Sequence, residues 1–411
     1  MAQYQITLNG EVLHALFSGD TGLKKLVEQV IQQVLEAQVT EQLQAAPHER
    51  TGTRLGYRNG YKPRKLTTRV GTLTLRIPQI REGKFSSELF ARYQRSEQAL
   101  ILALMEMVVN GVSTRKITQI TEELCGTEFS KSTVSDLAKR LNPIVNAWNE
   151  RDLGDSRYPF MLVDALLLRV REGGRITSMS LLMATGVNEA GYREVLGLML
   201  GDSESEATWT AFFQWLKGRR LQGVDLVVSD DHRGLVKAVH AQFQGSVWQR
   251  CQTHFIRNIL DAAPKALQEE LYPQVKALLD APDAVTAKML LQKILADYGP
   301  RAPRAMTVLE QGFEDATAVL ALPEPYRRRL RTTNGVERLN EELRRRERVI
   351  RIFPNRESAV RLLGAVLMEI DEKWGTGQRY FNMKVYWDWR KQQEEQVKQK
   401  ETESKASLLM V

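Results

Sequence analysis

The segment from Tyr158 to Arg250 alternates between strand patterns and helix patterns, and this alternation limits the possible folds more than any other feature of the 411-residue chain. Three apolar strand patterns come first, followed by helix, strand, helix and strand. The expected elements are, in chain order, Phe160–Arg171, Arg175–Gly186, Arg193–Leu200, Glu204–Arg219, Asp225–Ser229, Arg233–Phe243 and Val247–Gln249. Strands that alternate with helices are typical of a mixed sheet, so we expect an α/β core.

Two aspartates stand in unusual places in these expected strands. Asp164 lies in the middle of an apolar run, and Asp230 closes the run that starts at Val224. A carboxylate in an apolar strand is costly unless a cation or hydrogen-bond donors meet it. The order of elements matches a ribonuclease-H-like topology, in which these two strand positions are neighbours. The alternative for Asp230 is a helix cap, although Asp231 is better placed for that role.

A third carboxylate, Glu337, opens a helix-like stretch that runs to Arg346. Three carboxylates brought together repel one another, and two divalent metal ions would remove that repulsion. Two such ions can hold the attacking and leaving oxygens of a phosphodiester, and Mg²⁺ (or Mn²⁺) suits carboxylates combined with substrate phosphates. We therefore predict a two-metal phosphoryl-transfer site with Asp164, Asp230 and Glu337 as catalytic and metal-binding residues. The alternative for Glu337 is a capping box with Asn334.

Helical periodicity replaces the strand patterns between His254 and Leu330. This segment contributes to a separation of 107 residues between Asp230 and Glu337, more than a connection in a compact α/β unit requires. We therefore predict an all-helical insertion into the core. The prolines expected to divide it into pieces are Pro264, Pro273, Pro282, Pro300 and Pro303.

The N-terminal third carries patterns typical of DNA-binding modules. After a helix expected over Gly22–Gln44, the Gly-, Tyr- and Arg-rich stretch Arg50–Lys84 predicts a basic hairpin, with Asn59-Gly60 as a turn signal. Three short helices follow, predicted over Gln98–Asn110, Ser113–Cys125 and Ser130–Asn142. The last resembles the recognition helix of a helix-turn-helix, and an ordinary three-helix bundle is the alternative. The residues expected to contact DNA here are Arg58, Arg64, Lys65, Lys131, Ser132 and Thr133.

The predicted fold class is α/β, with a ribonuclease-H-like catalytic core interrupted by an all-helical insertion and preceded by N-terminal helical and helix-turn-helix DNA-binding modules. The expected parts are an N-terminal helical segment (1–49), the basic hairpin (50–95), the helix-turn-helix domain (96–150), the first part of the core (151–253), the insertion (254–330), the second part of the core (331–375) and an aromatic segment with a charged tail (376–411).

Positive charge is concentrated in two segments. Arg50–Lys84 carries a net charge of +9 and Tyr326–Arg356 one of +7, against +8 for the whole chain. Such concentrations attract a polyanion, and arginine suits bidentate phosphate contacts. A solvated charged face is the alternative for either segment alone. In the second segment we expect Arg338 to support the active site and Arg344 and Arg345 to contact DNA phosphates.

Cys251 and His254 follow the last expected strand. They could form half of a zinc site, but the chain offers one other cysteine and four other histidines, so packing and hydrogen bonding near the active site is the stronger expectation. For His232 we expect either a loop position near the metal ions or a contact with DNA. Core packing is the leading interpretation of Trp209 and Trp248, and Trp248 and Arg250 are also candidate DNA contacts.

Four motifs point to one family. They are Gly201–Phe213, Leu221–Leu235, Trp248–Asn258 and Thr333–Asn340 continued by Arg351–Asn355. Together they strongly resemble the Mutator-type transposases of bacterial insertion sequences, over a likeness that runs from about Arg50 to Trp374. The resemblance implies a DDE transposase whose ribonuclease-H-like domain is interrupted by a helical insertion. By motif matching, it makes Asp164, Asp230 and Glu337 the metal-binding triad and Cys251 and His254 the family's Cys-x-x-His signature. It also suggests insertion by way of an excised or copied circle.

We therefore predict a DNA transposase that binds terminal inverted repeats and carries out metal-dependent strand cleavage and strand transfer. A homodimer is the smallest sensible assembly, because two element ends must be joined. The alternatives are a catalytically silent DNA-binding regulator and a stand-alone nuclease. With no apolar run near 20 residues, no secretory signal and no disulfide framework, we expect a cytoplasmic, nucleoid-associated bacterial protein with neither a membrane partner nor a small-molecule substrate.

Overall fold

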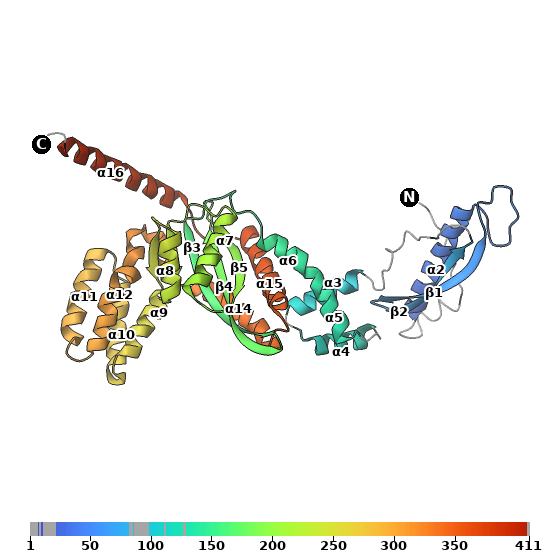
Figure 1. Cartoon of the computed structure of the whole chain (residues 1–411), viewed down its shortest axis with the longest axis horizontal. Coiled ribbons are helices and arrows are strands. Elements are labelled where there is room, and N and C mark those ends of the chain that lie inside the picture. The colour runs from blue at the N-terminus through green and yellow to red at the C-terminus, as the bar shows by residue number, and fades with distance from the viewer. Residues whose placement is uncertain are drawn as a thin grey trace. The chain divides into compact units, whose positions relative to one another are not determined.

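The computed structural model describes residues 7, 10, 22–81, 85, 98–110, 112–125 and 129–408 (Figure 1). The chain divides into two compact units, Met1–Arg140 and Leu141–Val411. This division lies inside the segment 96–150 that was expected to form one module. Parts of the predicted segments 1–49, 50–95 and 376–411 fall outside the described residues, as do Gly111 and Gly126 between the predicted short helices.

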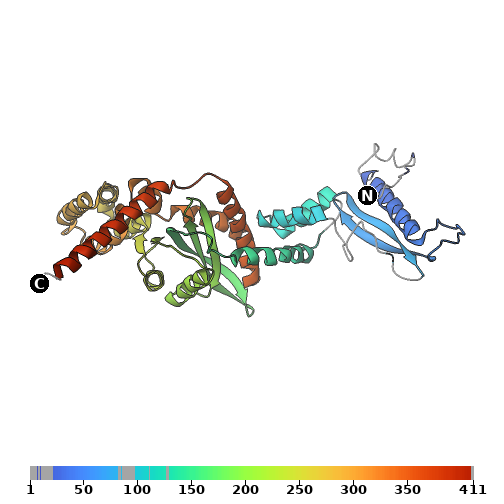
Figure 2. The same ribbon diagram turned by 90° about the horizontal axis from the view of Figure 1, so that it is seen from above.

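The first unit contains a helix packed on a two-stranded sheet (Figure 2). Its elements are α2 (Gly22–Leu43), β1 (Arg58–Thr68) and β2 (Gly71–Ile80). Leu66, Leu73 and Leu75 form the small core between them. The expected hairpin is present, but Asn59-Gly60 is not its turn, because the antiparallel pairing closes at Thr68 and Gly71. Gly60, with φ of +73°, instead lies where the strand register shifts.

Three short helices complete the first unit. They are α3 (Gln98–Val109), α4 (Thr114–Cys125) and α5 (Lys131–Ala138). Leu104, Ile117 and Val134 meet in their core. Ser130 caps α5 as expected, since its hydroxyl accepts a hydrogen bond from the Thr133 amide at 3.2 Å.

A five-stranded mixed sheet forms the centre of the second unit (Figure 1). Its strands are β3 (Phe160–Glu172), β4 (Arg175–Val187), β5 (Arg193–Gly201), β6 (Leu226–Ser229) and β7 (Val247–Arg250), in the spatial order β5-β4-β3-β6-β7. The first three strands pair antiparallel, whereas β3–β6 and β6–β7 are parallel. The mixed α/β class is confirmed, and each strand matches its predicted bounds to within one residue.

Different elements cover the two faces of the sheet. On one face Met161 and Val163 pack in a core that includes residues of α7 (Glu206–Gly218) and α8 (Arg233–Gln242). On the other face Phe160 and Leu162 pack against residues of α13 (Glu324–Leu330), α14 (Asn334–Ile350) and the C-terminal aromatic segment. Helices α6 (Asn142–Asn149) and α15 (Arg356–Thr376) pack at the β5 side. This places α14 on the face to which every second residue of β3 points.

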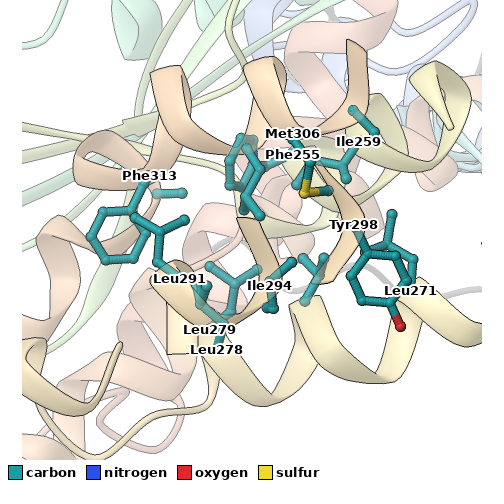
Figure 3. Packing of buried hydrophobic residues seen from close by; sticks show 14 of the residues in the cluster. Phe255, Ile259, Leu271, Leu278, Leu279, Leu291, Ile294, Tyr298, Met306 and Phe313 are labelled. Atoms are coloured by element: carbon teal, nitrogen blue, oxygen red, sulfur yellow. The ribbon is translucent and has the colours of Figure 1, made fainter. Parts of the chain in front are cut away.

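The segment between β7 and α13 is helical, as predicted, and has a core of its own (Figure 3). Its helices are α9 (Gln252–Ala262), α10 (Lys265–Leu279), α11 (Ala284–Tyr298) and α12 (Pro303–Thr317), followed by a short 3-10 turn at Ala318–Ala321. Phe255, Leu278, Leu291 and Phe313 are among the buried residues. Pro273 does not end a helix as expected but lies within α10. Leu271 and Val275 on either side of it are buried, and this packing stabilises the helix around the proline.

The C-terminal tail is a helix, α16 (Lys384–Leu408), rather than the frayed or disordered segment that its charge suggests. Tyr386 anchors its first turn: the ring is fully buried and its hydroxyl donates to Asp225 at 2.6 Å. In the described part of the chain, none of the helices combines the length and apolarity that a membrane crossing requires.

Candidate active site

Strand register places Asp164 beside Asp230. Parallel β3 and β6 pair Leu162 with Val228, and Asp164 and Asp230 each lie two residues further along the chain, Asp230 just after the end of β6. Because side chains alternate between the faces of a sheet, both carboxylates are expected on the face of Leu162 and Val228. Both side chains are half-buried. The charge of Asp230 acts on Asp164, so the sequence brings two acidic groups together where β3 and β6 stop pairing, on the face that α14 covers.

Asp164 is held by two hydrogen bonds. Its Oδ1 accepts from the Ala165 amide at 2.8 Å, and its Oδ2 accepts from Nδ2 of Asn340 in α14 at 2.7 Å. Burial raises the pKa of Asp164 to about 6; the Ala165 amide opposes this rise, and the charge of Asp230 adds to it. Asp164 is therefore an acidic group in a setting that disfavours its charge.

Glu337 lies in the first turn of α14, but it does not form the capping box considered from the sequence. The N-cap is Thr333, and Asn334 is already helical. The Glu337 amide donates to the Thr333 carbonyl at 2.9 Å, and the Thr333 hydroxyl donates to Glu337 Oε1 at 3.3 Å. The side chain of Asn334 instead meets the Thr253 hydroxyl at 3.4 Å. The carboxylate of Glu337 is thus oriented by the residue before the helix.

Cys251 and His254 join the start of α9 to the start of α14. The buried Cys251 Sγ accepts from the Thr333 amide at 3.4 Å and from its hydroxyl at 3.2 Å. Burial raises the pKa of the Cys251 thiol, but hydrogen bonds from His254 and Thr333 outweigh it and leave that pKa below its ordinary value. The bond to Cys251 raises the pKa of His254 against the effect of burial, and the charges of Asp230 and Glu337 raise it further.

The structure divides the predicted triad between two neighbouring clusters. The side-chain ligand atoms of Cys251, His254 and Glu337 all lie within 4.8 Å of one another. Among the described residues, these three form the group of His, Cys, Asp or Glu side chains that is close enough to hold a metal ion. Asp164, Asp230 and Glu337 do not form such a group there. Asp230 connects the clusters, because its charge acts on both Asp164 and His254.

Comparison with known proteins decides the family. The family model described as "Transposase, Mutator family" matches residues 1–377. The transposase for insertion sequence element IS256 in transposon Tn4001 of Staphylococcus aureus is 44% identical over 388 residues, 93% of this chain and 99% of that protein. The transposase for insertion sequence element ISRM5 of Rhizobium meliloti is 45% identical over 377 residues, 92% of this chain and 94% of that protein.

The chain belongs to the Mutator family of transposases. The predicted resemblance is confirmed, and with it the class of activity, that of a DNA transposase. Among solved structures, the Drosophila P element transposase strand transfer complex matches at 11% identity over 73% of this chain and 86% of that chain. Its TM-score is 0.30.

Two residues of this Mutator-family site were missed by sequence reasoning. Glu204 lies before α7 with its Oε1 3.7 Å from His232 Nδ1, and burial raises its pKa, an effect that His232 opposes and Asp230 reinforces. Asn340 contacts Asp164 directly. A signal for Asn340 exists, since it lies three residues after Glu337 on one helix face. For Glu204 the sequence offers no spacing that predicts its approach to Asp230.

Two of the residues predicted to contact DNA, Trp248 and Arg250, have buried side chains in this transposase. Trp248 is 6% exposed and its Nε1 donates to the Ser229 hydroxyl at 2.9 Å. Arg250 is 7% exposed and forms an ion pair with Asp231 at 3.0 Å. Asp231 is therefore not the cap of α8; His232 holds that position without a capping side-chain bond. Trp209 is fully buried, as the leading interpretation held.

The remaining predicted contacts differ in accessibility. Arg338, Arg344 and Arg345 are exposed on α14. Arg58 is tied to the end of α2, since its Nη1 donates to the Ala45 carbonyl at 2.8 Å and its Nη2 to the Thr40 hydroxyl at 2.7 Å. Of the others, Lys65, Ser132 and Thr133 are exposed, Arg64 is half-buried, and the side chain of Lys131 lies outside the described part.

A cleft of about 250 Å³ opens beside the start of α14. Its charged residues are Lys276, Arg328, Arg331 and Asp280, and Arg331 is paired with Asp280. The other lining residues are Gln252, Thr253, Ile256, Tyr272, Leu279, Thr332 and Asn334. The cleft is therefore net positive and borders the residues that position Glu337.

Proposed function

We propose that this transposase is of the DDE type, with Asp164, Asp230 and Glu337 holding two divalent metal ions, Mg²⁺ or Mn²⁺. The observation that carries the proposal is the register of β3 and β6, which sets Asp164 beside Asp230 on the face covered by α14. Asn340 ties α14 to Asp164, so the helix that bears Glu337 contacts the strand that carries Asp164.

We also assign the sheet to the ribonuclease-H-like class and α3–α5 to a helix-turn-helix. Support for the first comes from the order β5-β4-β3-β6-β7, with three antiparallel strands followed by parallel ones. Support for the second comes from the capped first turn of α5 with exposed Ser132 and Thr133. The helical segment α9–α12 then serves as the insertion between Asp230 and Glu337.

The donor set fits hard divalent ions. Asp164 and Asp230 offer carboxylate oxygens, the ligand type that Mg²⁺ prefers. The raised pKa of Asp164 reports burial and a like charge nearby, and a bound cation would relieve both. Bound metal ions supply Lewis-acid stabilisation of the attacking and leaving oxygens of a phosphodiester. Within the chain, Asn340 orients Asp164 and Thr333 orients Glu337.

The proposed reaction has two steps. Water attacks a phosphorus at the element end, the bond from phosphorus to the 3′ oxygen breaks, and the departing oxygen takes a proton to become a 3′-hydroxyl. That hydroxyl then attacks a second phosphodiester, forming a new ester bond as another 3′-hydroxyl leaves. Neither step needs an oxidant or a covalent bond to the protein.

The N-terminal modules are proposed to bind the terminal inverted repeats of the element, and two or more copies of the chain to hold the two ends together. The basic stretch Arg50–Lys84 supplies the charge for this contact. We place the protein on bacterial nucleoid DNA, the substrate that this chemistry requires.

The test is a cleavage and strand-transfer assay on the element's terminal DNA with Mg²⁺. Asp164→Asn should bind the DNA and give no product, because it removes the charge at the same size. Asp261→Asn, an exposed position on α9, is the matched control and should act like the wild type. Cleavage products from Asp164→Asn would refute the proposal. So would a wild type that binds the DNA but does not cleave it, whichever divalent metal is supplied.

A further inference from the structure

Two arginines from distant elements converge on one aromatic ring beside α14. The Cζ of Arg193 in β5 lies 4.4 Å from the ring centroid of Tyr380, and that of Arg329 in α13 lies 4.7 Å from it. Arg193 is also 4.1 Å from the ring centroid of Trp374, so its guanidinium contacts two aromatic rings. Such contacts fix the plane of the guanidinium and leave its N–H edge available for hydrogen bonds.

A third arginine faces the same place. Burial lowers the pKa of Arg193, and among its charged neighbours Arg329 and Arg338 lower it further. The charges of the same three arginines also lower the pKa of the Tyr380 hydroxyl, which burial raises. Arg338 lies one helical turn after Gly335 on the same face of α14, and a Cβ on Gly335 would be 3.9 Å from Nη1 of Arg193.

No counter-charge meets this cluster in the part of the chain that the structure describes. Among the described residues, no ion pair with a carboxylate involves Arg193, Arg329 or Arg338, and Arg329 donates to the Tyr380 backbone carbonyl instead. Three cations held close together without an anion repel one another. The cluster is also adjacent to Glu337, the residue before Arg338 in the chain. Its composition and place suit an anion bound close to the active site.

We propose that Arg193, Arg329 and Arg338 bind a backbone phosphate of the DNA strand on which this transposase acts. This inference builds on the proposed function, because it takes the DNA at the active site as its ligand. A planar guanidinium recognises phosphate oxygens in a bidentate manner, and two guanidiniums stacked on one ring can grip one phosphate from two directions. The site thereby positions the strand relative to Glu337 without reading its sequence.

The experiment measures DNA affinity against salt concentration for the full-length protein. The probe is a fluorescent mixed-sequence duplex of about 30 base pairs, in chelator, so that no cleavage takes place. Arg193→Gln/Arg329→Gln should weaken binding several-fold at about 0.1 M salt and lower the slope of log K against log salt by roughly one for each phosphate that the variant no longer neutralises. Arg304→Gln, an exposed arginine on α12, is the control and should leave the slope unchanged.

Two further variants keep the test decisive. Arg338→Gln changes an exposed residue, so it should fold normally and should lower the slope by about one even if the double variant does not fold. Arg193→Lys keeps the positive charge and the ring contacts but lacks the planar guanidinium. It should therefore have the salt slope of the wild type but a lower DNA affinity. A folded double variant, or a folded Arg338→Gln, with wild-type affinity and slope would overturn the inference.

The outcome is separable from that of the proposed function. Binding in chelator does not depend on chemistry, so a normal Asp164→Asn activity would refute the DDE assignment and leave the salt result standing. Conversely, an unchanged salt slope together with an inactive Asp164→Asn variant would retain the DDE assignment and reject the arginine cluster as a phosphate site.

Discussion

The two aspartates and the glutamate of the proposed triad are positioned by different means. Asp164 and Asp230 lie two residues beyond the last paired residues of β3 and β6, so the backbone pairing of these strands sets them side by side. The carboxylate of Glu337 is oriented by a hydrogen bond from Thr333. Thr333 is in turn bonded to Cys251, which lies 82 residues before Thr333 in the chain. A sheet therefore provides a rigid pair of acids, and a junction between two helix starts provides the third. We expect the junction to be the more easily disturbed part.

The largest effect should come from Glu337→Gln. This change removes the charge of the helix-borne carboxylate at constant size, and cleavage should fall to background while DNA binding persists. Glu341→Gln, on the next turn of α14 and exposed, is the matched control. The measurement is single-turnover cleavage of terminal DNA. Full activity of Glu337→Gln would break the comparison, because the junction would then lie outside the chemistry.

A smaller effect is expected from Thr333→Val, which sharpens the comparison. It removes the hydroxyl that bonds both Cys251 Sγ and Glu337 Oε1 but leaves the two aspartates untouched. Removal of such a supporting bond should lower the cleavage rate about 10- to 100-fold, with little change in DNA affinity. Thr332→Val is the control. A rate equal to that of the wild type would show that the helix start holds Glu337 without this bond.

The smallest effect concerns stability. In chelator, the folded chain holds the Asp164 proton with a pKa of about 6, above the ordinary value near 3.9, so the charged carboxylate destabilises the fold above pH 6. This destabilisation should fade as the pH falls through 6 and vanish below about pH 4. At pH 7, Asp164→Asn should gain up to roughly 3 kcal/mol, seen as a higher melting temperature.

The control for this third prediction is the pH dependence itself. The melting temperatures of Asp164→Asn and the wild type should converge near pH 4, where Asp164 is neutral in both the folded and the unfolded chain. Mg²⁺ should stabilise the wild type more than the variant, since it binds the charged site. A melting difference that does not change with pH would assign the gain to packing rather than to charge.

The sheet and its two aspartates could be predicted because the information is local. Apolar runs predicted to end at Arg171, Gly186 and Leu200 identify strands one by one, each within one residue of its observed end, and the mixed order of strands and helices makes Asp164 and Asp230 neighbours. The predicted adjacency agrees with the register, which rests on the same alternation of side chains.

The surroundings of Glu337 could not be predicted because they depend on tertiary contacts. Thr333 and Asn334 are both good cap residues, and the local sequence does not choose between them. Cys251, 82 residues before Thr333, accepts hydrogen bonds from the amide and hydroxyl of Thr333, and these bonds favour Thr333 as the N-cap. The burial of Arg250 could not be predicted for the same reason, since its contacts with Asp231 and with the ring of Phe255 form only in the fold.

The residues that lead into α9 and those that begin α14 are hydrogen-bonded to one another. Cys251 bonds Thr333, the Gln252 amide donates to the Arg331 carbonyl at 2.9 Å, and the Thr253 hydroxyl donates to Asn334. These bonds fasten the two ends together, and the helical segment α9–α12 between them has a separate core. Its length can therefore change at little further entropic cost, because closure is already made at the base. Such a segment is free to diverge or be exchanged during evolution while the chemistry beneath it stays constant.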